Sequence, residues 1–480
     1  MSITTGSTTQ GGAVLLPGFV GTELPPWLEA RLRRGLAGVC LFAANIVSPD
    51  QLRALTAAIR AANPHALIAI DEEGGDVSRL YAATGSPFPG NAVLGRLDDA
   101  SLTASVGAAV ARELRAAGVN LNFAPDVDIN SNPDNPVIGV RSFGTDPALV
   151  ARHAAAWIAA HEAEGVAVSA KHFPGHGDTA QDSHHALPVV DLPLDTLRAR
   201  ELVPFVAAVA AGARTIMSSH ILLPQLDATG PATFSARILG ELLRGPADEG
   251  GLGFTGVIVS DALDMAGASG EIGIPAAAVR ALAAGCDLLC IGTRNTDEQL
   301  VAIEAAIGAA LADGTLATER LADAEARVGA LAASLPGDAI DQPPAFAVDP
   351  ARVAQAFDIA DGVLPLPAGI RILSLETTAN MAVGPDVPWG LASVGVEPQR
   401  LHEGDALPAS DAPYLIVGKD NHRRAWTRDL IDRARAAQPG SVVIDMGWPA
   451  PDRRYADIAT FGASRSVSDA VRSLLEGTEQ

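Results

Sequence analysis

A short stretch in the middle of the chain gathers side chains that could move protons and bind polar ligands. It reads KHFPGHGDTAQDSH and covers residues 171–184. Lys171 is one of two lysines among the 34 lysine and arginine residues, and its fixed charge with three donors suits ligand hydroxyls or a carboxylate. Asp182 and His184 are two residues apart, a spacing at which a carboxylate can hold an imidazole in one tautomer and raise its basicity. The stretch therefore predicts a ligand site with a proton-transfer group.

Each of these side chains also has a structural interpretation. Lys171 could pair with Asp178 or another acid, and Asp182 could cap a helix while His184 stays in solvent. The scarcity of lysine and the position of Lys171 beside a predicted buried strand favour the ligand interpretation. For an isolated Asp-x-His pair the structural interpretation would be the better one.

A metal ion is an alternative ligand for this stretch. Its candidate ligands are His172, His176, Asp178 and His184. Metal-binding barrels usually gather ligands from several strands, whereas these residues crowd into one loop with prolines and glycines between them. We therefore expect no bound metal, and we interpret His176 and His185 as residues that shape the loop.

Three further stretches place polar side chains after apolar runs. Asp261 follows VIVS, where a carboxylate could attack or stabilise a cationic carbon, although it or Asp264 could instead cap the next helix. Asp71 ends the run ALIAI, and Arg79 and Arg141 lie in turn or loop segments after two of the runs. The neighbouring acids are as readily structural as functional: Glu72, Glu73, Asp126 and Asp128. A site with these residue types, in a chain without phosphate-binding glycine motifs, suits a ligand with many hydroxyl groups.

Eight apolar runs rich in Val, Ile and Leu supply the strands that would position these residues. The runs are 13–20, 38–45, 66–75, 119–128, 166–177, 214–223, 256–265 and 286–293. Alanine-rich segments with helical spacing lie between them, among them 50–62, 100–117, 146–164 and 194–212. Apolar runs without polar alternation are typical of parallel strands buried on both faces. The pattern predicts a (β/α)₈ TIM-type barrel, with the polar residues at the C-terminal ends of its strands.

The C-terminal part of the chain has a different pattern. A linker rich in Pro, Gly and Asp, 336–345, separates a predicted barrel domain, 1–335, from a smaller domain, 346–480. The apolar runs of the smaller domain are 369–376, 412–419, 441–449 and 456–464. They predict a three-layer α/β domain, and its residues look structural.

The overall composition limits the partners. A net charge of −22 argues against nucleic acid and anionic membranes, because their phosphates would be repelled. No apolar stretch reaches the length of a membrane span, and the N-terminus shows no basic start or apolar segment of a secretory signal. The three cysteines sit in apolar runs and are expected in the core. We expect a cytoplasmic protein that acts on a small molecule and needs no cofactor.

Four motifs in the same order along the chain resemble those of glycoside hydrolase family 3. They are DEEGGDVSR (71–79), GVRSFG (139–144), KHFPGHGDTAQDSH (171–184) and SDALDM (260–265). More narrowly, they resemble the NagZ-type β-N-acetylglucosaminidase branch, over roughly residues 12–335. The first motif departs from the usual family pattern DQEGGRV, because Glu72 and Asp76 replace a Gln and an Arg.

The resemblance implies a barrel enzyme that acts with retention of configuration through a glycosyl-enzyme intermediate. It implies that Asp261 is the nucleophile and that His184, paired with Asp182, is the general acid/base. The residues implied to bind N-acetylglucosamine in the −1 subsite are Asp71, Arg79, Arg141, Lys171 and His172. A histidine would then replace the second carboxylate that retaining glycosidases usually have.

The expected substrate is a peptidoglycan or chitin fragment with a terminal β-linked N-acetylglucosamine, and wall-fragment recycling fits a cytoplasmic location. The closest alternative is a phosphorylase of the same branch that uses phosphate as acceptor, because a neutral imidazole repels phosphate less than a carboxylate does. A β-glucosidase is a weaker alternative, since its acid/base would normally be a carboxylate outside the Asp-Ser-His motif. A metal-dependent barrel hydrolase is a further alternative, and it would lose activity on chelation.

Overall fold

The chain divides into two compact units. The computed structural model describes residues 11–183, 186–270, 272–367, 369–378, 381–384 and 387–477. Unit 1 comprises the residues up to Glu72, Ala100–Ile129 and Asp146–Pro344, and unit 2 comprises Glu73–Asp99, Asn130–Thr145 and the residues from Ala345 onward. Two internal segments therefore belong to the same unit as the C-terminal residues. The domain limits expected from the sequence stay a prediction.

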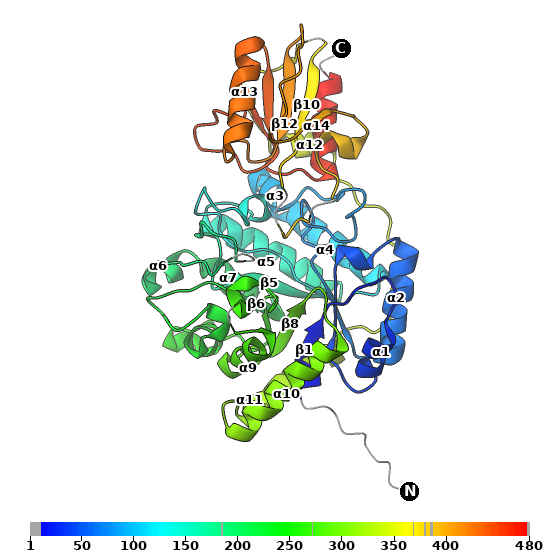
Figure 1. Cartoon of the computed structure of the whole chain (residues 1–480), viewed down its shortest axis with the longest axis vertical. Helices are drawn as coiled ribbons and strands as arrows, with labels where there is room; N and C mark the ends of the chain where they lie inside the picture. Colours follow the sequence, from blue (N-terminus) through cyan, green and yellow to red (C-terminus); the bar gives the residue numbers. More distant parts are fainter. Residues whose placement is uncertain are drawn as a thin grey trace. The chain divides into compact units, whose positions relative to one another are not determined.

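Unit 1 is built on eight parallel strands. Their bounds are β1 Leu15–Pro17, β2 Gly38–Leu41, β3 Leu67–Ile70, β4 Leu121–Asn122, β5 Ala167–Phe173, β6 Thr215–Ser218, β7 Val257–Ser260 and β8 Leu288–Gly292. They are hydrogen-bonded in the order β1-β8-β7-β6-β5-β4-β3-β2, and β1 also contacts β2, so the order runs round the whole set. Every residue of these strands is buried, as expected for strands covered on both faces. The barrel expected from the sequence is confirmed, and Figure 1 shows helices outside the strands.

The helices of unit 1 follow its strands. Their bounds are α1 Pro26–Leu32, α2 Pro49–Ala62, α4 Ala100–Ala116, α5 Pro147–Ala163, α6 Leu194–Ala199, α7 Val203–Ala210, α8 Ala266–Ser269, α9 Ile274–Ala284, α10 Asp297–Asp313 and α11 Thr318–Ser334, with a π-helix at Arg237–Arg244. Ser48 caps α2 by accepting a hydrogen bond from Gln51 N. The segment 194–212, expected as one helix, is interrupted before α7, because Pro204 has no N–H to donate and its ring crowds the carbonyl four residues back. Across the described ranges, the helices are too short or too polar to cross a membrane.

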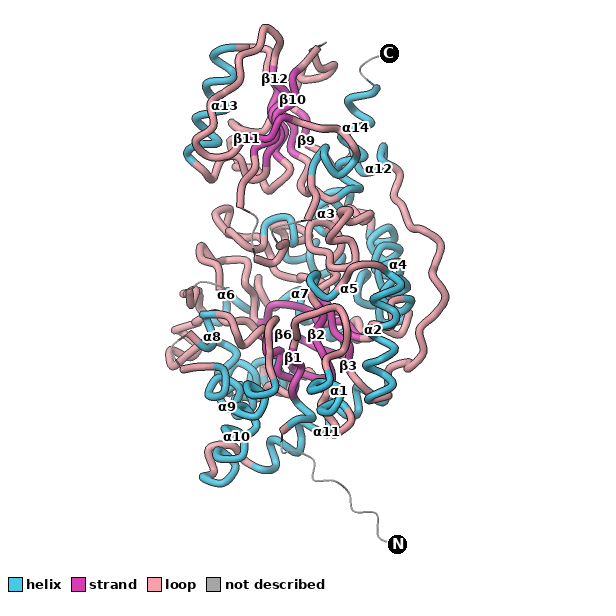
Figure 2. Tube along the Cα trace, turned by 45° about the vertical axis from the view of Figure 1, so that its right-hand side comes forward, coloured by secondary structure: helices cyan, strands magenta, loops and turns pink. Residues whose placement is uncertain are grey.

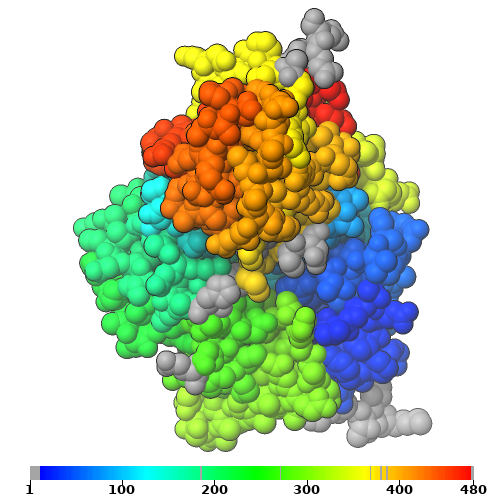
Figure 3. Space-filling view, turned by 45° about the horizontal axis from the view of Figure 1, so that its top comes forward, coloured from blue at the N-terminus to red at the C-terminus, as the bar shows by residue number. Residues whose placement is uncertain are grey.

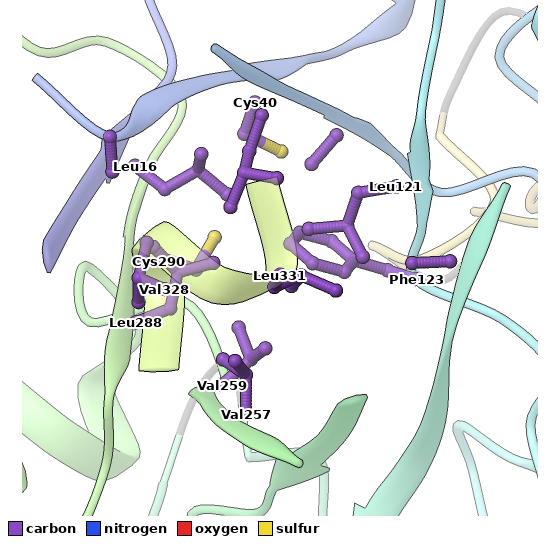
Figure 4. Packing of buried hydrophobic residues seen from close by; sticks show 14 of the residues in the cluster. Leu16, Cys40, Leu121, Phe123, Val257, Val259, Leu288, Cys290, Val328 and Leu331 are labelled. Carbon is purple, nitrogen blue, oxygen red and sulfur yellow. The ribbon is translucent and has the colours of Figure 1, made fainter. Parts of the chain in front are cut away.

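The barrel interior is filled by small and medium apolar side chains. Strand and strand-end members of the main cluster include Leu16, Cys40, Leu67, Leu121, Phe123, Val257, Val259, Leu288 and Cys290. Helix α11 adds Val328 and Leu331 to the same cluster (Figure 4). It also contacts the short helical turn that precedes β1, so it covers the N-terminal end of the barrel. The opposite, C-terminal end of the barrel is therefore where the polar site residues are expected.

Unit 2 contains a second sheet with strand order β11-β10-β12-β13-β14-β9. The bounds are β9 Asp358–Ile359, β10 Arg371–Leu375, β11 Gln399–Leu401, β12 Tyr414–Gly418, β13 Val442–Asp445 and β14 Ile458–Ala459. Neighbouring strands are parallel except β9, which is antiparallel to β14.

Helices cover both faces of this sheet. Their bounds are α12 Pro350–Ala354, α13 Ala425–Ala437 and α14 Arg465–Gly477, and α3 Asn91–Leu97 also belongs to unit 2. Helix α13 lies on one face and α12 and α14 lie on the other (Figure 2), which confirms the three-layer arrangement. The orange residues that include α13 form part of the outer surface of this unit (Figure 3).

Candidate active site

Four of the expected site residues lie at the C-terminal edge of the barrel strands. Asp71 directly follows β3, and Asp261 directly follows β7. Lys171 and His172 lie within β5 and not in the loop after it, because the pairing of β5 with β6 continues to Phe173. Parallel barrel strands all end at the same edge, so these residues share one end of unit 1.

Lys171 forms a partly buried ion pair with Asp71. Its Nζ donates a hydrogen bond of 2.8 Å to Asp71 Oδ1, and the two side chains are 3% and 19% exposed. Asp178, the partner considered from the sequence, pairs with Arg200 instead, at 2.6 Å. The pair places a cation beside a carboxylate at the strand edge, an arrangement that can donate to and accept from ligand hydroxyls.

Asp128 holds the histidine next to Lys171. Its Oδ2 lies 2.7 Å from Nδ1 of His172, and its Oδ1 accepts a hydrogen bond of 2.6 Å from the backbone N of His176. The carboxylate is buried, so it fixes the His172 ring with Nε2 facing away from it. Sequence reasoning missed this role because Asp128 also fits a local turn, in which its backbone N donates to Asp126 Oδ1 at 2.9 Å.

The same cluster contains side chains that could hold a metal ion. Among the described residues, Asp126, Asp128 and His172 offer ligand atoms within 4.8 Å of one another. This set shares only His172 with the ligands considered from the sequence. Both oxygens of Asp128 already face N–H groups, which is the environment of a carboxylate that orients a histidine.

His176 organises the turn that precedes Asp182. Its ring is buried, with Nδ1 3.1 Å from Thr179 Oγ1 and Nε2 3.1 Å from Ser183 Oγ. Burial lowers the pKa of His176 to about 4, so the ring is neutral near pH 7. A neutral ring accepts a hydrogen bond at one nitrogen and donates at the other, and the two hydroxyl groups can serve either role.

Asp182 lies two residues before the expected acid/base and is half-buried. The carbonyl of the next residue, Ser183, accepts a hydrogen bond of 3.2 Å from the first turn of α8. This bond ties the loop to the segment that follows β7. His184 and His185 lie outside the described residues, so the role of His184 stays a prediction.

Asp261 is a half-buried carboxylate, and its Oδ1 accepts a hydrogen bond of 2.8 Å from Ala262 N. The cap position of α8 is Met265, so helix capping does not account for this aspartate. The buried His220, after β6, supports the same turn: its Nε2 is 3.1 Å from the Ala262 carbonyl oxygen and its Nδ1 is 2.9 Å from Thr233 Oγ1. The sequence shows His220 at a strand end but does not tie it to Ala262.

Arg79 and Arg141 lie in unit 2. Glu73 accepts two hydrogen bonds from the buried Arg141 guanidinium, at 2.7 and 3.0 Å. Arg79 is 9% exposed, and its Nη1 lies 3.4 Å from the Val383 carbonyl oxygen. A pocket of this unit is lined by residues that include Glu73, Asp76, Asn91, Arg141 and Phe461.

Comparison with known proteins places the chain among glycosidases. Residues 29–331 match the family model described as the glycosyl hydrolase family 3 N terminal domain. The chain is 38% identical over 342 residues to the Beta-hexosaminidase A of Pseudoalteromonas piscicida, covering 66% of this chain and 56% of that protein. It is 38% identical over 339 residues to the Beta-hexosaminidase of Stenotrophomonas maltophilia (strain K279a), covering 66% of this chain and 98% of that protein. The chain thus spans little more than half the length of the first relative and nearly all of the second.

A solved structure extends the likeness to both units. The glycoside hydrolase family 3 beta-N-acetylglucosaminidase from Paenibacillus sp. str. FPU-7 matches with a TM-score of 0.84 at 29% identity, covering 99% of this chain and 97% of that chain. A fungal multi-domain beta-N-acetylglucosaminidase of the same family matches with a TM-score of 0.85 at 28% identity, covering 98% of this chain and 59% of that chain.

Proposed function

Because the chain belongs to glycosyl hydrolase family 3, we propose that it releases terminal β-linked N-acetylglucosamine with retention of configuration. The observation that carries the proposal is the set of side chains at one end of the barrel. Asp261 stands at the end of β7, the Lys171–Asp71 pair joins β5 to the end of β3, and Asp128 orients His172. That end of a barrel is where active sites of this fold form.

In this reaction Asp261 is the nucleophile. One of its oxygens bonds to the anomeric carbon while the bond from that carbon to the leaving oxygen breaks, which gives a glycosyl-aspartate ester. Water then attacks the same carbon, the ester bond breaks and the carboxylate is restored. Two inversions at one carbon give net retention. The hydrogen bond from Ala262 N supports the role, because it holds the carboxylate in a defined orientation.

Protons pass through His184 in this mechanism. As an imidazolium it protonates the leaving oxygen, and as a neutral imidazole it takes a proton from the attacking water. Asp182 stabilises the charged ring. The neighbouring turn supports the assignment, because the contact of His176 with Ser183 fixes the chain directly before His184.

We further propose that Asp71, Arg79, Arg141, Lys171 and His172 bind the sugar in the −1 subsite. Within unit 1 the acceptor Asp71 and the donor Lys171 stand side by side, which suits sugar hydroxyls because each of them both donates and accepts. The likeness to a beta-hexosaminidase and a beta-N-acetylglucosaminidase supports an N-acetylhexosamine as the sugar. Peptidoglycan and chitin fragments are the proposed substrates, in the cytoplasm.

The test is turnover of an aryl β-N-acetylglucosaminide in buffers with and without phosphate. Free N-acetylglucosamine is expected at similar rates in both buffers, with the β-anomer appearing first by NMR. Sugar 1-phosphate, formed faster with phosphate, would make the protein a phosphorylase. Release of the α-anomer first would refute the two-step mechanism, and loss of activity in a chelator would support the metal-dependent alternative.

A single substitution tests the nucleophile. Asp261→Asn is expected to lower kcat by about 10³-fold or more, because no ester intermediate can form, while the fold is kept. Asp264→Asn is the matched control, since Asp264 is exposed and lies three residues along the same segment. An Asp261→Asn enzyme with near-normal turnover would refute the assignment of Asp261 as the nucleophile.

A further inference from the structure

The second lysine of the chain, Lys419, is also paired with an acid of the segment 71–79. It directly follows β12, and its Nζ lies 3.2 Å from Asp76 Oδ2. The ammonium also lies 4.9 Å from the centre of the Trp389 ring. The other oxygen of Asp76 accepts a hydrogen bond of 2.7 Å from Ala463 N. Two separate C-terminal segments of unit 2 therefore hold one aspartate.

The Asp76–Lys419 pair is shielded from water, with side chains that are 6% and 19% exposed. Exposed pairs such as Arg454–Asp432 of the same unit, at 60% and 45% exposure, contribute little because water and salt screen them. The Asp76–Lys419 pair is screened less than such pairs, so it can hold the two segments together.

Asp76 lies within a closed turn that leads to Arg79. Glu73 N donates to the Val77 carbonyl oxygen at 3.1 Å, and an antiparallel bridge closes the turn. Glu73, at the start of the turn, binds the Arg141 guanidinium with both oxygens. Arg79 follows two residues after the turn closes. A displacement of Asp76 is therefore passed to the turn that carries Arg79 and anchors Arg141.

We propose that Lys419 is a positioning residue for substrate binding. Through Asp76 it sets the place of the turn 73–79, and with it the guanidinium groups of Arg79 and Arg141. The inference rests on the proposed function, in which those two arginines contact the sugar. It gives the C-terminal segment of the chain a role in substrate affinity, where the sequence indicates only structural residues.

The test compares full-length Lys419→Met, Asp76→Asn and the double variant with the wild type. The measurements are kcat and KM on an aryl β-N-acetylglucosaminide and the Kd of N-acetylglucosamine by calorimetry. Each single variant is expected to raise KM and Kd about tenfold while kcat changes less than about threefold. The double variant should be no worse than either single variant, because all three remove the same interaction. Lys419→Arg keeps the charge and should keep KM within about threefold of the wild type.

Arg454→Met breaks the exposed pair of the same unit and is the control that should change neither constant. Thermal unfolding of each variant separates loss of position from loss of fold, and the near-isosteric Asp76→Asn decides the outcome if Lys419→Met does not fold. The inference would be overturned, and the proposed function kept, if KM were unchanged in the single variants. The same would follow if the increases in KM of the two single variants multiplied in the double variant. A wild-type protein without turnover would overturn the proposed function and the inference with it.

Discussion

Asparagine in place of Asp128 should reveal how far the site depends on one buried carboxylate. Asp128 lies within hydrogen-bond distance of Nδ1 of His172 and accepts hydrogen bonds from the backbone N of both His172 and His176. Asparagine has the same shape, but one of its oxygens becomes an NH₂ group. That group then faces either the backbone N–H of His176 at 2.6 Å, where no hydrogen bond can form, or Nδ1 of His172 at 2.7 Å, which can accept from it only as the tautomer with its proton on Nε2.

The magnitude follows from the bonds that change. A hydrogen bond to a charged group contributes about 1.5–3 kcal/mol, and a buried donor left unsatisfied costs about 1–3 kcal/mol. We therefore expect the free energy of unfolding to fall by about 3–5 kcal/mol, which lowers the unfolding midpoint of a unit of this size by about 5–8 °C. The His172 ring then changes its orientation or its tautomer, and misplacement by about 1 Å costs around 10²-fold in rate, so kcat/KM should fall by about that factor.

Thermal unfolding by circular dichroism and steady-state kinetics on the aryl substrate measure the two effects. Asp146→Asn makes the same chemical change at the exposed cap of α5, where asparagine caps as well as aspartate, so its midpoint should stay within about 1 °C. An Asp128→Asn protein with unchanged midpoint and unchanged kcat/KM would refute the reasoning. A lowered midpoint with full kcat/KM would refute only the link from Asp128 to substrate.

One further prediction concerns Gly177, in the loop that follows β5, and another concerns Glu201, between α6 and α7. Gly177→Ala should lower kcat at least tenfold and increase proteolysis of 171–184, because a Cβ there would lie 1.6 Å from the Ile129 carbonyl oxygen. Gly329→Ala is the control, because a Cβ at that position meets nothing within 4 Å. Equal kcat and equal proteolysis of the two variants would contradict the prediction. Burial raises the pKa of Glu201 from 4.5 to about 7, so the folded protein binds the proton of this carboxyl group more tightly than the unfolded chain does. The contribution of the protonated group to the free energy of unfolding is therefore fully present below pH 4.5 and is lost as the pH rises to 7. Relative to Glu201→Gln the wild type should therefore lose up to about 3 kcal/mol over this interval, and parallel curves of unfolding midpoint against pH would exclude the effect.

The barrel could be predicted because its strands are buried on both faces and consist mostly of apolar residues. The run VIVS at 257–260 is buried at every position, and its composition alone indicates a central parallel strand. The edge strands of the second sheet could not be found in this way. Asp358–Ile359 and Gln399–Leu401 have neighbours on one side only and carry exposed polar residues, so no apolar run marks them.

The types of site residue could also be predicted, but their partners could not. Lys171 was visible as an unusual cation, yet its partner Asp71 is 100 residues away, whereas the nearby Asp178 binds a different arginine. The Lys419–Asp76 pair joins residues 343 apart. Such pairs depend on which strand ends meet in space, and no local spacing encodes that.

The pairing of β1 with β8, in which Leu15 lies opposite Leu289, sets an order of events during synthesis. Strands β3 to β7 can each pair with the preceding strand as they emerge, but β1 must wait for its β8 partner. At about 5–20 residues per second, the ribosome needs tens of seconds to add the intervening chain. During that time one edge of β1 stays open to other strands, including those of neighbouring nascent chains. The edge of β1 that pairs with β8 is therefore among the last edges of the barrel to be covered.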